Sequence, residues 1–154
     1  MSHLDPEDAV GKQAAVLEFS DDLRGADVRP LQAFLAARFG ELAENQIEGT
    51  DAHWTAAHLA QVIDTYCRDL DDDLVTWEVT VRERRIQEPG LVQMLRQSIA
   101  TDWNRLVDTA SRWAGHPDHL SRWRRLRYSS VEHAEFVEQV LGDATDAGTF
   151  YDQA

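Results

Sequence analysis

The sequence predicts an all-α protein, a helical bundle of four main helices plus a short one, centred on a long antiparallel helical hairpin. Apolar residues recur every three or four positions over long segments, as on the buried face of an amphipathic helix. Glycine and proline separate these segments, and no alternating run is long enough for a sheet. With 154 residues, 43% of them apolar, the chain can bury the core of one domain. We expect that domain over residues 1–142 and a mobile acidic tail over residues 143–154.

The first helix is expected to run from Asp5 to about Leu23. Asp5 suits the N-cap, Pro6 suits the first helical position, and Gly25 is expected to end the helix. Its apolar face is marked by Val10, Ala14 and Leu17.

The second helix is expected to begin near Asp27, with Pro30 in its first turn, and to end with Gly49 at the C′ position. Its apolar residues follow spacings of four, four and three, which place them on one face. These residues are Leu31, Leu35, Phe39 and Leu42.

The third helix is expected to be the longest. It should extend from a cap at Thr50 or Asp51 to about Ile86, a length of roughly 50 Å. Its apolar seam continues through the Asp-rich run 69–73 with nearly heptad spacing, at Ala56, Leu59, Ile63, Tyr66, Leu70, Leu74, Trp77 and Val81. A tight turn at residues 88–90 leads to a fourth helix over residues 92–113. The third and fourth helices are therefore expected to form the antiparallel hairpin.

Two further elements are expected near the C-terminus. Gly115 and Pro117 should end the fourth helix, and a short helix should cover residues 118–127. Ser129 and Glu132 match a capping box, so a last helix is expected over residues 130–141.

The most distinctive segment is residues 112–128, which we call the basic island. It holds five arginines and one aspartate, a net charge of +4 in a chain whose net charge is −13. Arginine binds carboxylates in bidentate geometry, and Arg and Trp are enriched at interface hot spots. The residues expected to contact a partner are Arg112, Trp113, Arg122, Trp123, Arg124, Arg125, Arg127 and Tyr128.

An intramolecular role is the alternative for the basic island. The rest of the chain carries a net charge of −17, so the arginines could neutralise acidic faces of the second and third helices, and Trp113 could complete the core. The negative charge of the whole chain repels polyphosphates, so we expect no direct binding to nucleic acid. No apolar run approaches the ~18 residues of a membrane span, so no membrane partner is expected.

No motif predicts catalysis, a cofactor or a metal. His116 and His119, together with Asp118, come closest to a metal site, but short His pairs more often have capping or surface roles. The carboxylates of the run 69–73 point to different helix faces, which favours a solvated surface over a cation site. Cys67 is expected to be half-buried and unreactive. We therefore assign no catalytic, cofactor-binding or metal-binding residue.

Three segments carry a family resemblance: LQAFLAARFGELAE at 31–44, VTVRERRI at 79–86, and LVDTASRWAGHPDHLSRWR at 106–124. They resemble a family of small uncharacterised proteins from high-GC Gram-positive bacteria and their phages, and they cover about a quarter of the chain. The resemblance implies a bacterial or phage origin and no activity, cofactor or partner.

The sequence thus favours a cytoplasmic, non-catalytic protein-interaction module that docks an unidentified protein through the basic island or an exposed seam. One alternative is an acidic decoy or immunity-type protein that blocks a basic nucleic-acid-binding site. Another is a small-molecule-binding or enzymatic bundle that uses Trp54, His58 and Tyr66. A homodimer is expected because a hairpin of roughly 50 Å exposes more apolar seam than the other helices cover.

Overall fold

The fold contains three long helices and three short helical turns within residues 17–127, the part of the chain that the computed structural model describes. In chain order the elements are η1 (Ser20–Asp22), α2 (Gly25–Glu44), α3 (Asp51–Trp77), η2 (Glu78–Glu83), α4 (Pro89–Ala110) and η3 (Ser111–Trp113). The all-α class is confirmed, since β-structure in this range is limited to one bridge between Phe19 and Arg127. Most of the first predicted helix, the helix predicted at 130–141 and the tail predicted at 143–154 lie outside the described residues.

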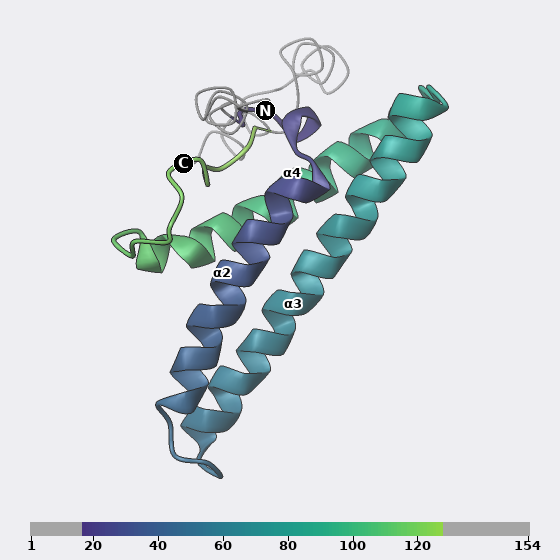
Figure 1. Cartoon of the computed structure of the whole chain (residues 1–154). Helices are drawn as coiled ribbons and strands as arrows, with labels where there is room; N and C mark the ends of the chain where they lie inside the picture. The colour runs from purple at the N-terminus through teal and green to yellow at the C-terminus, as the bar shows by residue number, and fades with distance from the viewer. Residues whose placement is uncertain (1–16, 128–154) are drawn as a thin grey trace, which may run out of the picture.

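Helices α2 and α3 form the central antiparallel hairpin (Figure 1). They are joined by the short loop 45–50, which holds Gly49 at a φ of +85° and caps α3 through Thr50. The Thr50 Oγ1 accepts a hydrogen bond from the His53 N–H at 3.2 Å, so Thr50 is the cap of the two that the sequence allows. The prediction of Gly49 at the C′ position of the second helix is wrong, because α2 ends at Glu44.

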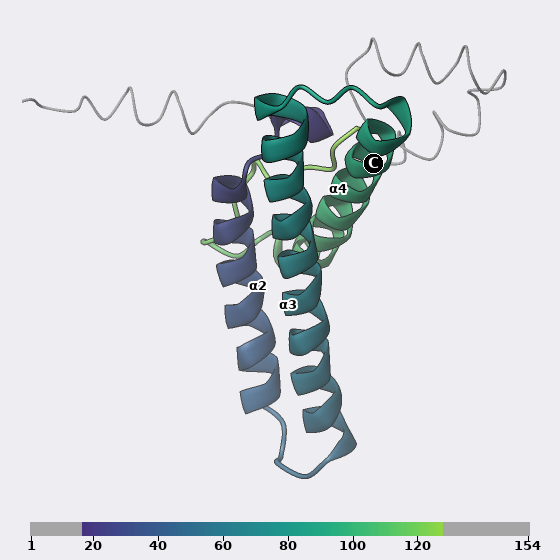
Figure 2. The same cartoon turned by 90° about the vertical axis from the view of Figure 1, so that its right-hand side faces the viewer.

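The hairpin pairs α2 with α3, whereas the sequence favours a hairpin of α3 with α4. Helix α4 begins at Pro89, close to the predicted turn, but it crosses α3 obliquely and covers only the half of the hairpin near the α3 C-terminus (Figures 1 and 2). Five residues without helical structure, 84–88, separate η2 from α4, and this connection lets α4 turn away from the α3 axis. The core lies where the three helices meet, around Leu31, Leu35, Leu70, Trp77, Ile99 and Trp103.

The prediction of one continuous third helix through the Asp-rich run is confirmed. Helix α3 passes directly into η2, a π-helical turn, so residues 51–83 form a single rod of roughly 50 Å. Arg85 has a φ of +52°, the left-handed conformation that commonly ends a helix.

Two predicted helical segments are instead irregular. The helix predicted to continue to Leu23 is absent at residues 17–19, where the Phe19 N–H donates to the Asp22 carboxylate at 2.9 Å and the Arg127 N–H donates to the Glu18 carbonyl at 2.9 Å. Gly25 opens α2 rather than ending a preceding helix, so Pro30 lies in the second turn of α2. The short helix predicted at 118–127 is also absent, since this segment consists of turns and extended chain.

One end of the hairpin projects beyond the rest of the molecule. No residue from 40 to 66 is buried, although this stretch includes Leu42, Ile47, Trp54 and Leu59. We call this stretch the hairpin end. Figure 2 shows it extending away from α4 and from the chain that follows α4. No helix within residues 17–127 is long and apolar enough to cross a membrane.

Candidate functional site

The basic island is held against α4 by two polar side chains. The Trp103 Nε1 donates to the Arg124 carbonyl at 2.8 Å. The buried amide of Asn104 accepts from the Leu126 N–H at 2.6 Å and donates to the Leu126 carbonyl at 3.0 Å. These bonds satisfy main-chain groups of Arg124 and Leu126 that a helix would otherwise pair internally, and they favour a non-helical path for this part of the island.

The two tryptophans of the basic island pack against α2. Trp123 is only 6% exposed, and its ring centroid lies 5.0 Å from that of Phe34 on α2. Trp113 packs edge-on against Phe39 at 5.6 Å. Both rings thus contribute to packing on α2, in agreement with the intramolecular alternative for Trp113.

The arginines of the island divide into two groups. Arg122 forms an ion pair with Asp27 at 2.6 Å, and the Arg125 Nε lies 3.8 Å from the Asp108 carboxylate. The residues Arg112, Arg124 and Arg127 are exposed, and Tyr128 lies outside the described residues. The structure therefore brings the predicted contact residues together on one segment, but it turns part of the set toward the molecule's own acidic groups.

The turn at residues 116–119 is a packing element. His116 and His119 both meet Phe34 edge-on, at 5.5 and 5.7 Å. The His116 Nδ1 accepts from the Asp118 N–H at 3.0 Å, and its Nε2 contacts the buried Arg38 guanidinium. Both ring nitrogens of His116 thus have protein partners, and within residues 17–127 no group of three His, Cys, Asp or Glu residues could hold a metal ion.

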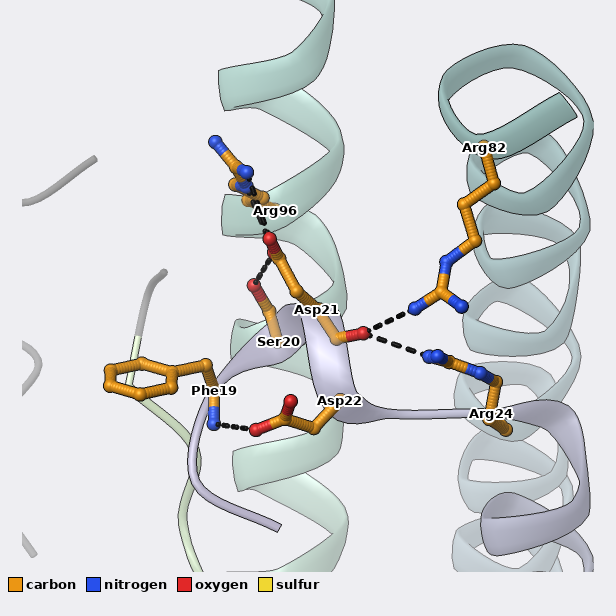
Figure 3. Close-up of polar contacts among 7 residues, drawn as sticks. All are labelled: Phe19, Ser20, Asp21, Asp22, Arg24, Arg82 and Arg96. Carbon is orange, nitrogen blue, oxygen red and sulfur yellow. Dashed lines mark hydrogen bonds and ion pairs between the residues drawn. The ribbon is translucent and has the colours of Figure 1, made fainter. Parts of the chain in front are cut away.

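A second cluster of arginines surrounds Asp21. Arg96 binds the Asp21 carboxylate with two hydrogen bonds of 2.8 Å, while Arg82 and Arg24 donate to the Asp21 carbonyl at 2.7 and 2.8 Å (Figure 3). This arrangement connects the segment before α2 to both α4 and η2. The guanidinium groups bind the main-chain carbonyl and the carboxylate of Asp21, so this cluster stabilises the packing of the segment before α2.

Within residues 17–127, two titratable groups, Cys67 and Asp102, have shifted pKa values. Burial raises the pKa of the Cys67 thiol to about 12, with Asp64 and Asp71 adding to the shift. Cys67 is fully buried rather than half-buried, and its thiolate is suppressed at neutral pH. Burial also raises the pKa of Asp102, and the neighbouring carboxylates of Asp73 and Asp69 act in the same direction.

The outward face of α3 and η2 carries a second row of residues opposite the core seam. Eight positions repeat at alternating spacings of four and three, all eight are exposed, and we call them the outer stripe: Trp54, His58, Gln61, Thr65, Arg68, Asp72, Val75 and Val79. Trp54 is 64% exposed and Val75 is 62% exposed. Figure 2 looks onto the side of α3 that neither α2 nor α4 covers.

Apolar side chains occupy both ends of the outer stripe. Trp54 stacks on His58 with the rings 4.9 Å apart and nearly parallel, which orients a large flat surface toward solvent. Tyr66, which the enzymatic hypothesis grouped with these two residues, lies elsewhere, beneath the Arg105 guanidinium of α4 at 5.7 Å. The signal for the stripe was present in the sequence as a second four-three repeat beside the core seam.

Comparison of the chain with family models, curated proteins and solved structures finds no match. The resemblance to a family of small bacterial and phage proteins stays a prediction.

Proposed function

We propose that this chain is a non-catalytic protein-interaction module that docks through the outer stripe of α3. The observation that carries the proposal is that all eight positions of this stripe are exposed, with Trp54 at one end and Val75 and Val79 at the other. Large exposed apolar residues arranged along one face of a helix are typical of a surface that another protein covers. Tryptophan is also among the residues that contribute most to interface stability.

The acidic-decoy alternative receives less support from the same surface. A decoy needs carboxylates in a continuous row, whereas the outer stripe contains a single one, Asp72. Docking through the basic island stays a prediction, which rests on its exposed guanidinium groups at Arg112 and Arg124.

Site-specific photocrosslinking tests the proposal. A photoreactive amino acid at exposed position Gln61, in the middle of the outer stripe, is expected to give a defined adduct in cells, while the same group at Met94 on α4 gives none. The protein in the adduct is then purified, and its affinity for the chain is measured.

Trp54→Ala is expected to weaken that affinity by about tenfold or more, whereas the matched control Met94→Ala leaves it unchanged. Met94 is 58% exposed and so resembles Trp54 in exposure. An affinity that is insensitive to Trp54→Ala would contradict the proposed function.

A further inference from the structure

We infer that the hairpin end, residues 40–66, binds a basic segment of another protein in which Lys or Arg residues are interspersed with apolar ones. The inference rests on the proposed function, because Trp54 belongs to both surfaces. It adds the loop 45–50 to the surface and names the chemistry of the partner. Figure 2 shows that this end of the hairpin projects beyond α4, so the rest of residues 17–127 leaves it uncovered.

The hairpin end presents apolar side chains that the fold does not bury. Among the large apolar residues of the described part of the chain, Ile47 and Trp54 are the most exposed, at 78% and 64%. Leu42 and Leu59 are exposed as well. A group of exposed apolar residues at one end of a small protein is typical of a surface that another protein covers.

Ile47 and Trp54 are held in place before a partner binds. The Ile47 carbonyl accepts hydrogen bonds from the Thr50 N–H at 3.1 Å and from the Thr50 Oγ1 at 2.6 Å. The Trp54 ring stacks on the His58 ring, with the centroids 4.9 Å apart. Binding therefore has few groups left to order here, which lowers the entropic cost of association.

The charged side chains around these apolar residues have one sign. The hairpin end contains five carboxylates and neither Lys nor Arg. Two of the carboxylates are bound within the fold, since Glu41 pairs with Arg38 and Asp64 pairs with Arg68. The other three are exposed and form no ion pair within residues 17–127: Glu44, Glu48 and Asp51. A partner that covers the apolar residues thus meets unpaired negative charge, which Lys or Arg complements.

The fold does not require two of these three carboxylates. Glu44 is the last residue of α2, and a negative charge is unfavourable at the C-terminal end of a helix. Glu48 lies in the loop 45–50 and forms no side-chain bond within the described residues. Both carboxylates are therefore available for the ammonium or guanidinium groups of a partner.

Other occupants of this surface are disfavoured by charge. The carboxylates repel nucleic acid and anionic lipid. Residues 1–16 carry a net charge of −2 and residues 128–154 carry −6, so neither segment neutralises the hairpin end. The hairpin end of a second copy is equally acidic. A basic segment with apolar side chains complements both the carboxylates and the exposed apolar residues.

A synthetic amphipathic peptide tests the chemistry of the partner. The probe is a fluorescein-labelled, helix-forming peptide of Leu and Lys with about 14 residues, and a matched peptide has Glu in place of every Lys. Fluorescence anisotropy with the full chain at about 150 mM salt should show a dissociation constant below about 100 μM for the basic peptide. The acidic peptide should not bind. Failure of the basic peptide to bind saturably overturns the inference.

Paired substitutions test whether the peptide binds at the hairpin end. Glu44→Gln combined with Glu48→Gln should raise the dissociation constant about fivefold or more, and Trp54→Ala should raise it about tenfold. The matched control is Glu83→Gln combined with Glu88→Gln, which removes two exposed, unpaired carboxylates near the opposite end of the rod formed by residues 51–83. The control pair should change the dissociation constant by less than about twofold. Equal effects of the two pairs would mean that only net charge matters, and they overturn the inference.

Thermal unfolding separates a role in binding from a role in folding. The Glu44→Gln and Glu48→Gln pair should leave the melting temperature unchanged or raise it, because neither carboxylate has a partner within the described residues. A large decrease in the melting temperature would mean that these carboxylates stabilise the fold, and it contradicts the inference.

The failures of the two proposals are distinguishable. If the protein crosslinked at position 61 binds with an affinity that depends on Trp54 but not on Glu44 and Glu48, the proposed function stands and the basic partner is wrong. The same conclusion follows if that protein is a second copy of this chain. If position 61 gives no specific adduct, the proposed function itself is contradicted, whatever the peptide binding shows.

Discussion

At the scale of single residues, buried polar side chains determine where the chain after α4 goes. Trp103 and Asn104 are adjacent on α4 and bind main-chain groups of residues 124 and 126. Asn104 is particularly important because it satisfies both an N–H and a carbonyl of the fully buried Leu126. A buried main-chain group without a partner is costly, so this one amide makes the extended path of the island favourable.

Asn104→Ala is therefore expected to destabilise the fold by about 2–4 kcal/mol, because two buried main-chain groups lose their partners at once. Urea unfolding followed by circular dichroism measures the change. Asn45→Ala is the matched control, since Asn45 is exposed at the end of α2 and should change the free energy of unfolding by less than about 0.5 kcal/mol. Equal decreases in the free energy of unfolding of the two variants would contradict this role of Asn104.

Asp102 gives a prediction about pH. Burial raises its pKa in the fold above the ordinary value of 3.8, with Asp73 as the next largest cause, so the native state keeps a proton that the unfolded chain releases. The contribution of Asp102 to the free energy of unfolding is therefore greatest below pH 3.8. It decreases as the pH rises through the pKa of Asp102 in the folded state, and it remains lower at neutral pH.

Asp102→Asn should accordingly raise the melting temperature at pH 7, and the gain should shrink as the pH falls toward 3.8, because the wild-type carboxyl is then neutral as well. Thermal unfolding of both proteins at a series of pH values measures this difference in melting temperature. Asp72→Asn, at an exposed position on the outer stripe, serves as the control. A lower melting temperature for Asp102→Asn at pH 7 would be inconsistent with the stated cause of the shift.

At the scale of elements, the helix ends depend on local bonds. Thr50 both accepts from the His53 N–H and donates to the Ile47 carbonyl at 2.6 Å, so it closes the loop and starts α3. At the start of α2 the bond runs the other way along the chain: Asp27, the third helical residue, accepts from the N–H of the N-cap residue Arg24 at 2.9 Å. These interactions connect residues three apart in the sequence, so each helix start depends on a local bond.

Thr50→Ala should reduce the free energy of unfolding by about 1 kcal/mol, the usual cost of losing an N-cap. Thr55→Ala is the matched control, because Thr55 is exposed inside α3 and alanine has the higher helix propensity. Chemical denaturation of both variants distinguishes the cap from a general effect of removing threonine. If Thr55→Ala reduced the free energy of unfolding as much as Thr50→Ala, the capping role of Thr50 would be contradicted.

At the scale of the whole molecule, charge determines which partners are favourable. The net charge of −13 opposes binding to nucleic acid, and the island is less able to compensate than its composition indicates. Arg122 is paired with Asp27, and Arg125 lies beside Asp108. Fewer guanidinium groups are therefore available to neutralise phosphates.

Duplex DNA is expected to bind only weakly, and only at low salt, since each phosphate contact that could be made is outweighed by repulsion from the acidic surface. Fluorescence anisotropy with a labelled duplex at about 150 mM salt measures this. A dissociation constant below about 1 μM under these conditions would refute the prediction.

Amphipathic periodicity was sufficient to establish the helical class and the continuous rod through the Asp-rich run, and the capping residues limited the start of α3 to Thr50 or Asp51. These features depend on residues three or four positions apart, whose interactions are present in any tertiary context. The family resemblance, the dimer and the docking role of the island stay predictions.

The pairing of α2 with α3, the inward orientation of Trp123 and the extended island were decided only by the tertiary structure. An apolar face in the sequence indicates that it must be covered, but it does not identify the neighbour that covers it. Residues 118–127 illustrate the reason: their helical propensity was outweighed by bonds to Trp103 and Asn104, more than twenty residues away in the sequence. Contacts over such separations depend on the assembled fold, so no local pattern contains them.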